Sequence, residues 1–307
     1  MDFTKMTGAG NDFIVLGADS GLPPKPEAIR LLCDRRYGVG ADGLMVIAGS
    51  VSGGRPEPSF SVDFYNADGS GGMLCGNGAR CALVYSAARG LIAYGRPVAF
   101  SFAGKLYTGT AIAPDRARFM LDPHYTTRLE DMVQTDTANA SGRYVDLGSL
   151  HFVVDLADLK FAYREARESR ESWGSGASSG PGLSGGSSVE AGTWGLPLDQ
   201  LDVASLGAAL RHHERFAPSG VNVNFCSLID SKIHVRTFER GVEAETLACG
   251  TGSTASALSY ALRGLVRPPV RIVTRSAEEL IIDFDDPAKP SRLSLEGSAR
   301  VVFEGWV

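Results

Sequence analysis

The sequence contains few of the residues that build disulfide frameworks or metal sites. Its 307 residues include only five histidines and five cysteines, the latter being Cys33, Cys75, Cys81, Cys226 and Cys249. An odd, sparse set of cysteines in a chain of this length excludes a disulfide-stabilised scaffold. No two of them form a Cys-x-x-Cys pair, and no spacing typical of a zinc site is present. The sequence therefore predicts no metal.

The chain also lacks a long apolar run and a strong charge of either sign. No stretch approaches the roughly 18 uninterrupted apolar residues of a membrane helix, and residues 1–5 do not resemble the start of a signal peptide. The formal net charge of -5 argues against nucleic acid or an anionic membrane as a partner. We expect a soluble, cytoplasmic protein of about two domains, at roughly 150 residues per domain.

One segment is unusually rich in glycine and serine. Twelve of the fifteen residues from 174 to 188 are Gly or Ser, six of each. Such a composition cannot bury enough apolar surface to offset the entropy of ordering it. We interpret residues 165–197 as a flexible surface insertion in the second half of the chain.

The chain contains an internal repeat. Residues 75–91 and 249–265 align without gaps, and seven of the seventeen positions are identical, including Cys-Gly-x-Gly at the start and Arg-Gly-Leu at the end. A weaker echo, Phe13-Ile14-Val15 and Phe152-Val153-Val154, precedes each block. The second copy is longer by about the length of the Gly/Ser-rich segment. We therefore expect two similar domains, residues 1–140 with Cys75 and residues 141–307 with Cys249.

Each block predicts a buried helix that begins next to a cysteine. Apolar residues cover most faces of the expected helices, 77–89 and 251–263, and Gly90 and Gly264 stand where a left-handed cap is typical. A cysteine just before a helix is expected to have a lowered pKa, because it lies at the positive end of the helix dipole. Glycines after it leave backbone N–H groups open to a carboxylate.

Two facing copies of this arrangement point to one kind of chemistry. A single Cys-Gly-x-Gly could equally be a structural helix start, and Cys33, Cys81 and Cys226 are expected to be small buried side chains. A pair related by pseudo-twofold symmetry would supply a base on one face of a carbon and an acid on the other, which is what inversion at an α-carbon requires. It would also supply N–H donors for the charge that develops on the carboxylate.

Several motifs resemble those of the diaminopimelate epimerase family. They are Phe3-x-Lys5-Met6-x-Gly8-x-Gly10-Asn11-Asp12-Phe13, Asp34-Arg35-x-x-Gly38-x-Gly40-x-Asp42, Asn66-Ala67-Asp68-Gly69-Ser70, Cys75-Gly76-Asn77-Gly78-x-Arg80, Glu239-Arg240-Gly241 and Cys249-Gly250-Thr251-Gly252. The resemblance implies an α/β (α+β) fold of two pseudo-symmetric domains, each a curved, mostly antiparallel sheet around a central helix. It implies an active site in the cleft between them, with no pyridoxal phosphate, metal or other cofactor.

The resemblance also implies roles for particular residues. Cys75 and Cys249 would be the acid/base pair that interconverts LL- and meso-diaminopimelate, in lysine and cell-wall precursor biosynthesis. Glu239 would take the substrate ammonium group and, with His151, set the protonation of the thiols. Backbone at four positions would hold the reacting carboxylate: Gly76, Asn77, Gly250 and Thr251. The rest of the substrate would be held by Asn11, Asn66, Asn222 and Arg240, the last pairing with the distal carboxylate.

One departure from the family bears on the substrate. The family usually has Gly-Asn-Pro-His where this chain has Gly148-Ser149-Leu150-His151, so Ser149 replaces an Asn that touches the distal end of the substrate. Alternatives therefore stay open: a racemase of histidine, glutamate or a proline-like amino acid, and a non-catalytic binding protein on the same scaffold. The expected partner is a small amino-acid substrate, and a homodimer is a candidate assembly.

Overall fold

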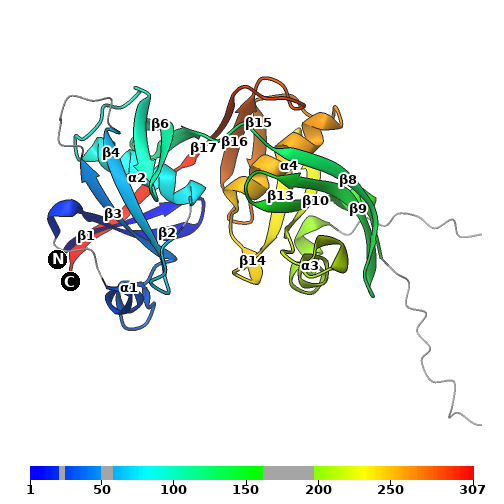
Figure 1. Ribbon diagram of the computed structural model, residues 1–307, viewed down its shortest axis with the longest axis horizontal. Helices are drawn as coiled ribbons and strands as arrows, with labels where there is room; N and C mark the ends of the chain where they lie inside the picture. The colour runs from blue at the N-terminus through cyan, green and yellow to red at the C-terminus, as the bar shows by residue number, and fades with distance from the viewer. Residues whose placement is uncertain (21–24, 50–57, 73, 162–196) are drawn as a thin grey trace, which may run out of the picture.

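The computed structural model describes residues 1–20, 25–49, 58–72, 74–161 and 197–307. The predicted insertion at 165–197 lies almost wholly outside this part of the chain. The described residues form two lobes that lie side by side, each with strands wrapped around one central helix, and the two chain ends meet on the first lobe (Figure 1). The expected α+β class is confirmed.

Eight strands build the first lobe, and ten build the second. The first lobe contains β1 (Asp2–Gly8), β2 (Asn11–Gly17), β3 (Gly43–Gly49), β4 (Phe60–Asn66), β5 (Val98–Phe102), β6 (Lys105–Ala113), β7 (Arg116–Met120) and β18 (Arg300–Trp306). The second lobe contains β8 (Thr126–Gln134), β9 (Ala138–Asp146), β10 (Leu150–Asp155), β11 (Leu159–Phe161), β12 (Asn222–Ile229), β13 (Lys232–Glu239), β14 (Ala244–Thr246), β15 (Val270–Val273), β16 (Glu279–Phe284) and β17 (Leu293–Ser298).

The strand pairing repeats from lobe to lobe. In the first, β1–β2 is antiparallel, β2–β3 parallel, β3–β4 antiparallel and β4–β5 parallel. In the second, β9–β10, β10–β12, β12–β13 and β13–β15 follow the same order of directions. Antiparallel pairing of β7 with β17 joins the lobes. The internal repeat predicted from the sequence is therefore present in the topology.

One strand of each lobe follows the strands of the other lobe in the sequence. β8, which follows the last strand of the first copy, pairs with β9 in the second lobe, and β18 returns to pair with β1 in the first. β9 spans residue 140, where the sequence analysis placed the domain boundary, and that boundary stays a prediction. The sequence does not reveal this exchange, because the paired strands β1 and β18 lie at opposite ends of the chain.

The central helices are α2 (Gly76–Ala88) and α4 (Gly250–Leu262), each of 13 residues. They begin and end one residue earlier than expected from the sequence. Residues 77–87 of α2 and 252–260 of α4 are buried without interruption, because small and apolar side chains cover every face. Gly90 and Gly264 both have a φ of 74°, the left-handed conformation that was predicted for the caps.

Two further helices cover the outside of the lobes. α1 (Pro26–Cys33) packs on β3 of the first lobe, and α3 (Val203–Arg211) packs on β12 and β13 of the second. α3 approaches the sheet closely, since a Cβ atom on Gly207 would lie 2.5 Å from the Cβ atom of Phe238. No helix in the described ranges is long and apolar enough to cross a membrane.

Candidate active site

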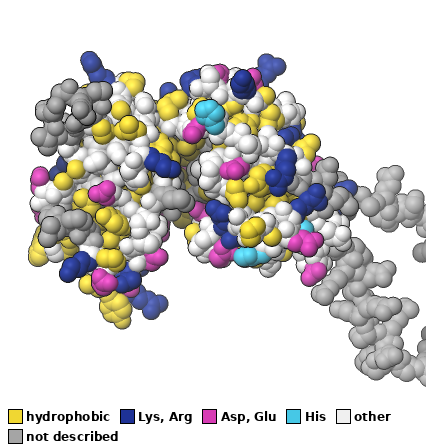
Figure 2. Space-filling model, in the orientation of Figure 1, with side chains coloured by type: hydrophobic (Ala, Val, Ile, Leu, Met, Phe, Trp, Pro, Cys, Tyr) yellow, Lys and Arg dark blue, Asp and Glu magenta, His cyan; other side chains and the backbone are white. Residues whose placement is uncertain are grey.

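The two central helices point their N-termini at each other. Cys75 is the N-cap of α2 and Cys249 the N-cap of α4. A Cβ atom on Gly250 would lie 3.8 Å from the Cα atom of Gly76, so glycine at both positions lets the helix starts approach. The surface is notched where the lobes meet (Figure 2). The structure thus brings together the two Cys-Gly-x-Gly blocks that the repeat predicted.

The sulfur of Cys249 contacts the first turn of its own helix. The backbone N–H of Gly252 donates to Sγ over 3.4 Å, and the Thr251 hydroxyl lies 3.5 Å from Sγ. Only 8% of Cys249 is exposed. Burial raises the pKa of Cys249 to about 12, Glu239 and Cys75 add to this rise, and the Thr251 and Gly252 contacts oppose it.

Cys75 is partly buried at the start of α2. Burial raises its pKa too, while the N–H groups of Gly78 and Asn77 and the charge of Arg80 favour the thiolate, and Glu239 opposes it. The sequence-based expectation of lowered thiol pKa values is therefore wrong for the protein alone. The helix termini act in the predicted direction, but removing a thiolate from water costs more than they return.

Glu239 is the last residue of β13, and the charge of its carboxylate acts on both thiols. Burial raises its pKa, Thr246 opposes that rise, and Asp42 adds to it. Its charge disfavours a thiolate at either cysteine. A cation bound at Glu239 would remove that effect, because the carboxylate charge would then be compensated.

His151 is fully buried in β10 and neutral. Burial, together with the charge of Arg240, lowers its pKa to about 3. Its Nδ1 accepts a hydrogen bond of 3.2 Å from the Asn224 side-chain amide, whose oxygen in turn accepts one of 3.0 Å from the Thr237 hydroxyl. This chain places the proton on Nε2, which has no hydrogen-bond partner in the described structure. Asn224 also lies under α4, since a Cβ atom on Gly252 would be 2.2 Å from its Oδ1.

Asn224 was missed by the sequence reasoning. It lies two residues after the predicted Asn222, in the same strand, and nothing in its local pattern separates it from an ordinary buried strand residue. Only the pairing of β12 with β10 and β13 brings it between His151 and Thr237.

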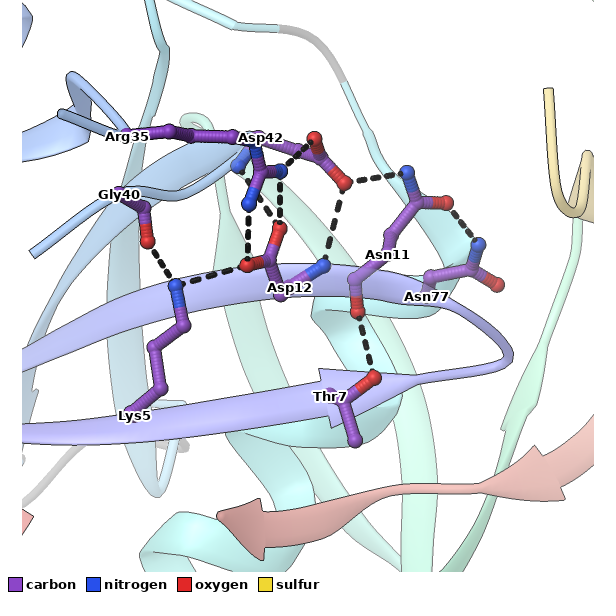
Figure 3. Close-up of polar contacts among 8 residues, drawn as sticks. All are labelled: Lys5, Thr7, Asn11, Asp12, Arg35, Gly40, Asp42 and Asn77. Carbon is purple, nitrogen blue, oxygen red and sulfur yellow. Dashed lines mark hydrogen bonds and ion pairs between the residues drawn. The ribbon is translucent and has the colours of Figure 1, made fainter. Parts of the chain in front are cut away.

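Asn77 ties the first turn of α2 to the β1–β2 hairpin and to the other lobe. Its amide donates to Asn11 Oδ1 over 2.5 Å and to the backbone oxygen of Ala248 over 3.4 Å. Asn11 is held in turn by Asp42, which accepts from its amide over 3.0 Å (Figure 3). Asn11 and Asn77 therefore belong to one polar group at the helix start, a contact that the sequence analysis did not predict.

A network of charges supports Asn11 from behind (Figure 3). Arg35 donates to Asp12 over 2.7 and 3.0 Å and to Asp42 over 2.7 Å, and Lys5 forms an ion pair of 2.8 Å with Asp12. Although burial opposes it, these contacts hold the pKa of Asp12 well below its usual range. The network orients Asp42 as the acceptor for the Asn11 amide.

A second polar group lies at the edge of the second lobe. The Asn222 amide donates to the Ser149 hydroxyl over 3.1 Å and to the Leu150 carbonyl over 2.8 Å, and its oxygen accepts from the backbone N–H of Arg240 over 2.9 Å. The structure thus brings together Ser149, Asn222 and Arg240, and their contact with the distal end of a substrate stays a prediction. The Arg240 guanidinium has no ion-pair partner within the described residues.

Asn66 is the predicted site residue that the described contacts do not connect to the others. It ends β4, and its amide donates to the Ser70 hydroxyl over 3.0 Å across a turn that contains Gly69 with a φ of 82°. Its contacts are those of a turn residue. The other cysteines behave as expected, since Cys33, Cys81 and Cys226 are buried and burial raises the pKa of each.

One cavity lies away from this site. It has a volume of about 1000 Å³ and lies beside β11 and β15 of the second lobe, and its lining includes Phe161, Leu228, Arg236 and Val273 but neither catalytic candidate. The helix starts bring together two thiols and the N–H groups of two first turns. Such a set can bind a carboxylate and exchange protons on either side of the adjacent carbon.

Sequence comparison identifies the family to which the chain is similar. The profile of the diaminopimelate epimerase family matches residues 3–120 and 197–302. The chain is similar to the diaminopimelate epimerase of Aquifex aeolicus, with 35% identity over 99% of this chain and 97% of the relative. It is likewise similar to that of Chlorobaculum tepidum, with 33% identity over 98% and 99%.

Solved structures share the fold at low sequence identity. A probable proline racemase from Agrobacterium radiobacter K84 superposes with a TM-score of 0.63 at 15% identity, covering 100% of this chain and 92% of that one. A hydroxyproline epimerase from Agrobacterium vitis gives 0.63 at 12% identity, covering 100% and 90%. These likenesses concern the fold, whereas the family profile and the relatives span both cysteine blocks. The chain belongs to the diaminopimelate epimerase family.

Proposed function

We propose that this protein is a cofactor-independent isomerase that interconverts LL- and meso-diaminopimelate by moving a proton at the α-carbon. The observation that carries the proposal is the meeting of two helix N-termini, each capped by a cysteine. Membership of the family and the names of its relatives support the choice of substrate.

The reaction uses one proton on each face. The thiolate of one cysteine removes the α-proton and becomes a thiol, while the other thiol donates its proton to the opposite face and becomes a thiolate. The electron pair left on the α-carbon is stabilised by delocalisation into the carboxylate, held by N–H groups of Gly76, Asn77, Gly250 and Thr251. Charge is conserved, and proton exchange with water returns the pair to its starting form.

Glu239 links substrate binding to thiol ionisation. Its carboxylate disfavours thiolate at both cysteines. A substrate ammonium group bound at Glu239 compensates that charge, so the thiolate becomes easier to form when the substrate is in place. His151 contributes a neutral Nε2–H donor, because its pKa of about 3 keeps it uncharged near neutral pH.

The distal group sets which amino acid is accepted. Arg240 would pair with the second carboxylate of diaminopimelate, and Asn222 with Ser149 would hold the distal amino-acid moiety. The decisive assay supplies LL-diaminopimelate and follows formation of the meso form, beside a panel that contains histidine, glutamate and proline. Conversion of diaminopimelate at a higher kcat/KM than any other amino acid supports the proposal. Faster racemisation of another amino acid contradicts the substrate, and binding without α-proton exchange contradicts the enzyme.

We also propose a cytoplasmic location and a homodimer. All five cysteines are free, which fits a reducing compartment. β18 pairs with β1 on one side only among the described strands, and its side chains Val301, Phe303 and Trp306 are 45%, 47% and 81% exposed. A second copy covering this strand would bury them. Sedimentation of the wild type and of Trp306→Lys tests this, and a monomeric wild type contradicts it.

A further inference from the structure

Arg80 is a buried cation at the first turn of α2. It is the bulkiest of the fully buried side chains, with 0% exposure, and it forms no ion pair in the described part of the chain. Its guanidinium donates to the backbone oxygens of Gly76 over 3.1 Å and Ser298 over 3.2 Å, and to Asn77 Oδ1 over 2.7 Å. All three acceptors are neutral, so its charge is not neutralised by these contacts.

This position is unfavourable for a cation on general grounds. The N-terminus of a helix carries partial positive charge, which repels a cation and attracts an anion. Burying a charge is costly unless an anion lies nearby to compensate it. The groups that can act on Arg80 as anions are the Glu278 carboxylate and, when ionised, the thiols of Cys81 and Cys75. Of the two thiols, Cys75 is the one in the proposed acid/base pair, and it lies one residue before the Gly76 carbonyl to which Arg80 donates.

The equivalent position of the repeat is neutral. Thr254 occupies the place in α4 that Arg80 occupies in α2, five residues after the cysteine. Its hydroxyl donates to the Gly250 carbonyl over 2.9 Å, just as Arg80 donates to the Gly76 carbonyl. Both side chains therefore satisfy the same backbone oxygen, but only the one in α2 brings a charge.

In the described part of the chain, no Arg or Lys side chain hydrogen-bonds to the first turn of α4 as Arg80 does to that of α2, and the cation that acts on the neighbouring His151 is Arg240. Beneath the first turn of α4 lie Asn224 and His151, and His151 is neutral because burial holds its pKa at about 3. The other groups that act on Cys249 are the hydroxyl of Thr251, the Glu239 carboxylate and Cys75. Glu239 acts against a thiolate at both cysteines.

We propose that Arg80 is a positioning residue that places the single negative charge of the cysteine pair on Cys75, leaving Cys249 protonated before the substrate reacts. The proposal rests on the proposed function, since it assigns the starting state of that acid/base pair. Cys75 is then the first base, Cys249 the first acid, and the isomer whose α-proton faces Cys75 reacts without a prior proton exchange. The charges that face the Arg80 guanidinium are Glu278 and Arg116 besides the cysteines.

The test measures thiol ionisation without turnover. Cys249→Ala leaves Cys75 as the one active-site thiol, and Cys75→Ala leaves Cys249. Each variant is alkylated with iodoacetamide across a pH series, the modified residue is located by mass spectrometry, and the pH midpoint of the rate is recorded. The midpoint reports the pKa of each thiol, whereas the absolute alkylation rate also depends on how accessible each sulfur is. We expect Cys75 to have the lower midpoint, by about 1 unit or more.

Arg80 is then altered in both backgrounds. Arg80→Gln should raise the Cys75 midpoint by about 1–3 units, the range for losing an adjacent opposite charge, and should shift Cys249 less. Arg80→Lys should retain most of the effect. The matched control is Thr254→Val, which removes the equivalent hydrogen bond in α4 without changing charge, and should leave the order of the midpoints intact.

Three results would overturn the proposal: a Cys249 midpoint at or below that of Cys75, no shift of Cys75 in Arg80→Gln, or an equal shift of both thiols. If Arg80→Gln does not fold, Arg80→Lys and the comparison of the two single-thiol proteins still decide the order. Failure of the wild type to epimerise diaminopimelate would count against the proposed function and leave the alkylation result unaffected.

Discussion

The Ser149 hydroxyl accepts a hydrogen bond of 3.1 Å from the side-chain amide of Asn222. The same amide donates to the Leu150 carbonyl, and the Asn222 oxygen holds the backbone of Arg240. Asn222 thus connects the Ser149 side chain to the backbone of Arg240, and all three residues are predicted substrate contacts. The serine hydroxyl is shorter than the asparagine amide usual in the family, so we expect this group to adjust substrate preference.

Ser149→Asn should change recognition more than chemistry. The residue contacts Asn222 and none of the groups around the thiols, so a longer side chain alters binding of the distal end. We expect a change of several-fold in KM for diaminopimelate with kcat nearly unchanged, the pattern of altered uniform binding. Steady-state kinetics check this, with Ser149→Ala as the control for simple loss of the hydroxyl. An equal fall in kcat and kcat/KM with KM unchanged would show action in the transition state.

Each cysteine should serve one face of the substrate. Cys75→Ala and Cys249→Ala should each lower epimerisation by on the order of 10²–10⁴ or more, the contribution of a positioned acid or base. Serine at either position should be almost as poor, because its hydroxyl is much less acidic than a thiol. Turnover is measured from both isomers, with Cys226→Ala as a control for loss of a buried thiol outside the helix starts.

Isotope exchange separates two bases from one. In deuterated water the product should carry deuterium from the first turnover while unreacted substrate carries little, because the returning proton comes from a different sulfur. Mass spectrometry of both pools reads this directly. Product that keeps the original α-hydrogen would mean that one base serves both faces.

Mild oxidation should inactivate the enzyme reversibly. The two helix starts lie close together at Gly76 and Gly250, and the N-cap residues Cys75 and Cys249 are both free thiols. A small movement of the lobes would bring Cys75 and Cys249 into disulfide geometry. We expect activity to vanish with oxidant and return with dithiothreitol, with the two residues linked in a peptide map. Loss of activity while both thiols remain alkylatable would contradict this account.

His151 should make stability depend on pH in acid. Its pKa is about 3 in the fold against 6.5 for the free side chain, because burial disfavours the imidazolium. The unfolded chain therefore binds the proton first, so the contribution is complete above about pH 6.5 and is lost as pH falls towards 3. Urea unfolding at several pH values should show this loss in the wild type. His151→Gln should flatten the slope across that window, and an unchanged slope would assign it to other groups.

Much of the arrangement follows from local sequence. The repeat, the two helices, their glycine caps and the cysteines at their starts depend on spacing and on backbone preferences, which act between neighbours in the chain. The same is true of much of the burial of α2 and α4, since most of their residues are small or apolar, although α2 also buries Asn77 and Arg80. These features were all predicted and are present.

Other properties depended on residues that are distant in the sequence. The exchange of β8 and β18 between lobes, the Thr237–Asn224–His151 chain and the burial of the Arg80 guanidinium exist only because strands from both halves pack around the helices. Burial by that packing also reversed the expected direction of the thiol pKa values. Sequence alone determined the position of the reacting groups on their helices, because helix capping is a local interaction. Tertiary structure decided their protonation, because the loss of hydration depends on every group packed around a thiol.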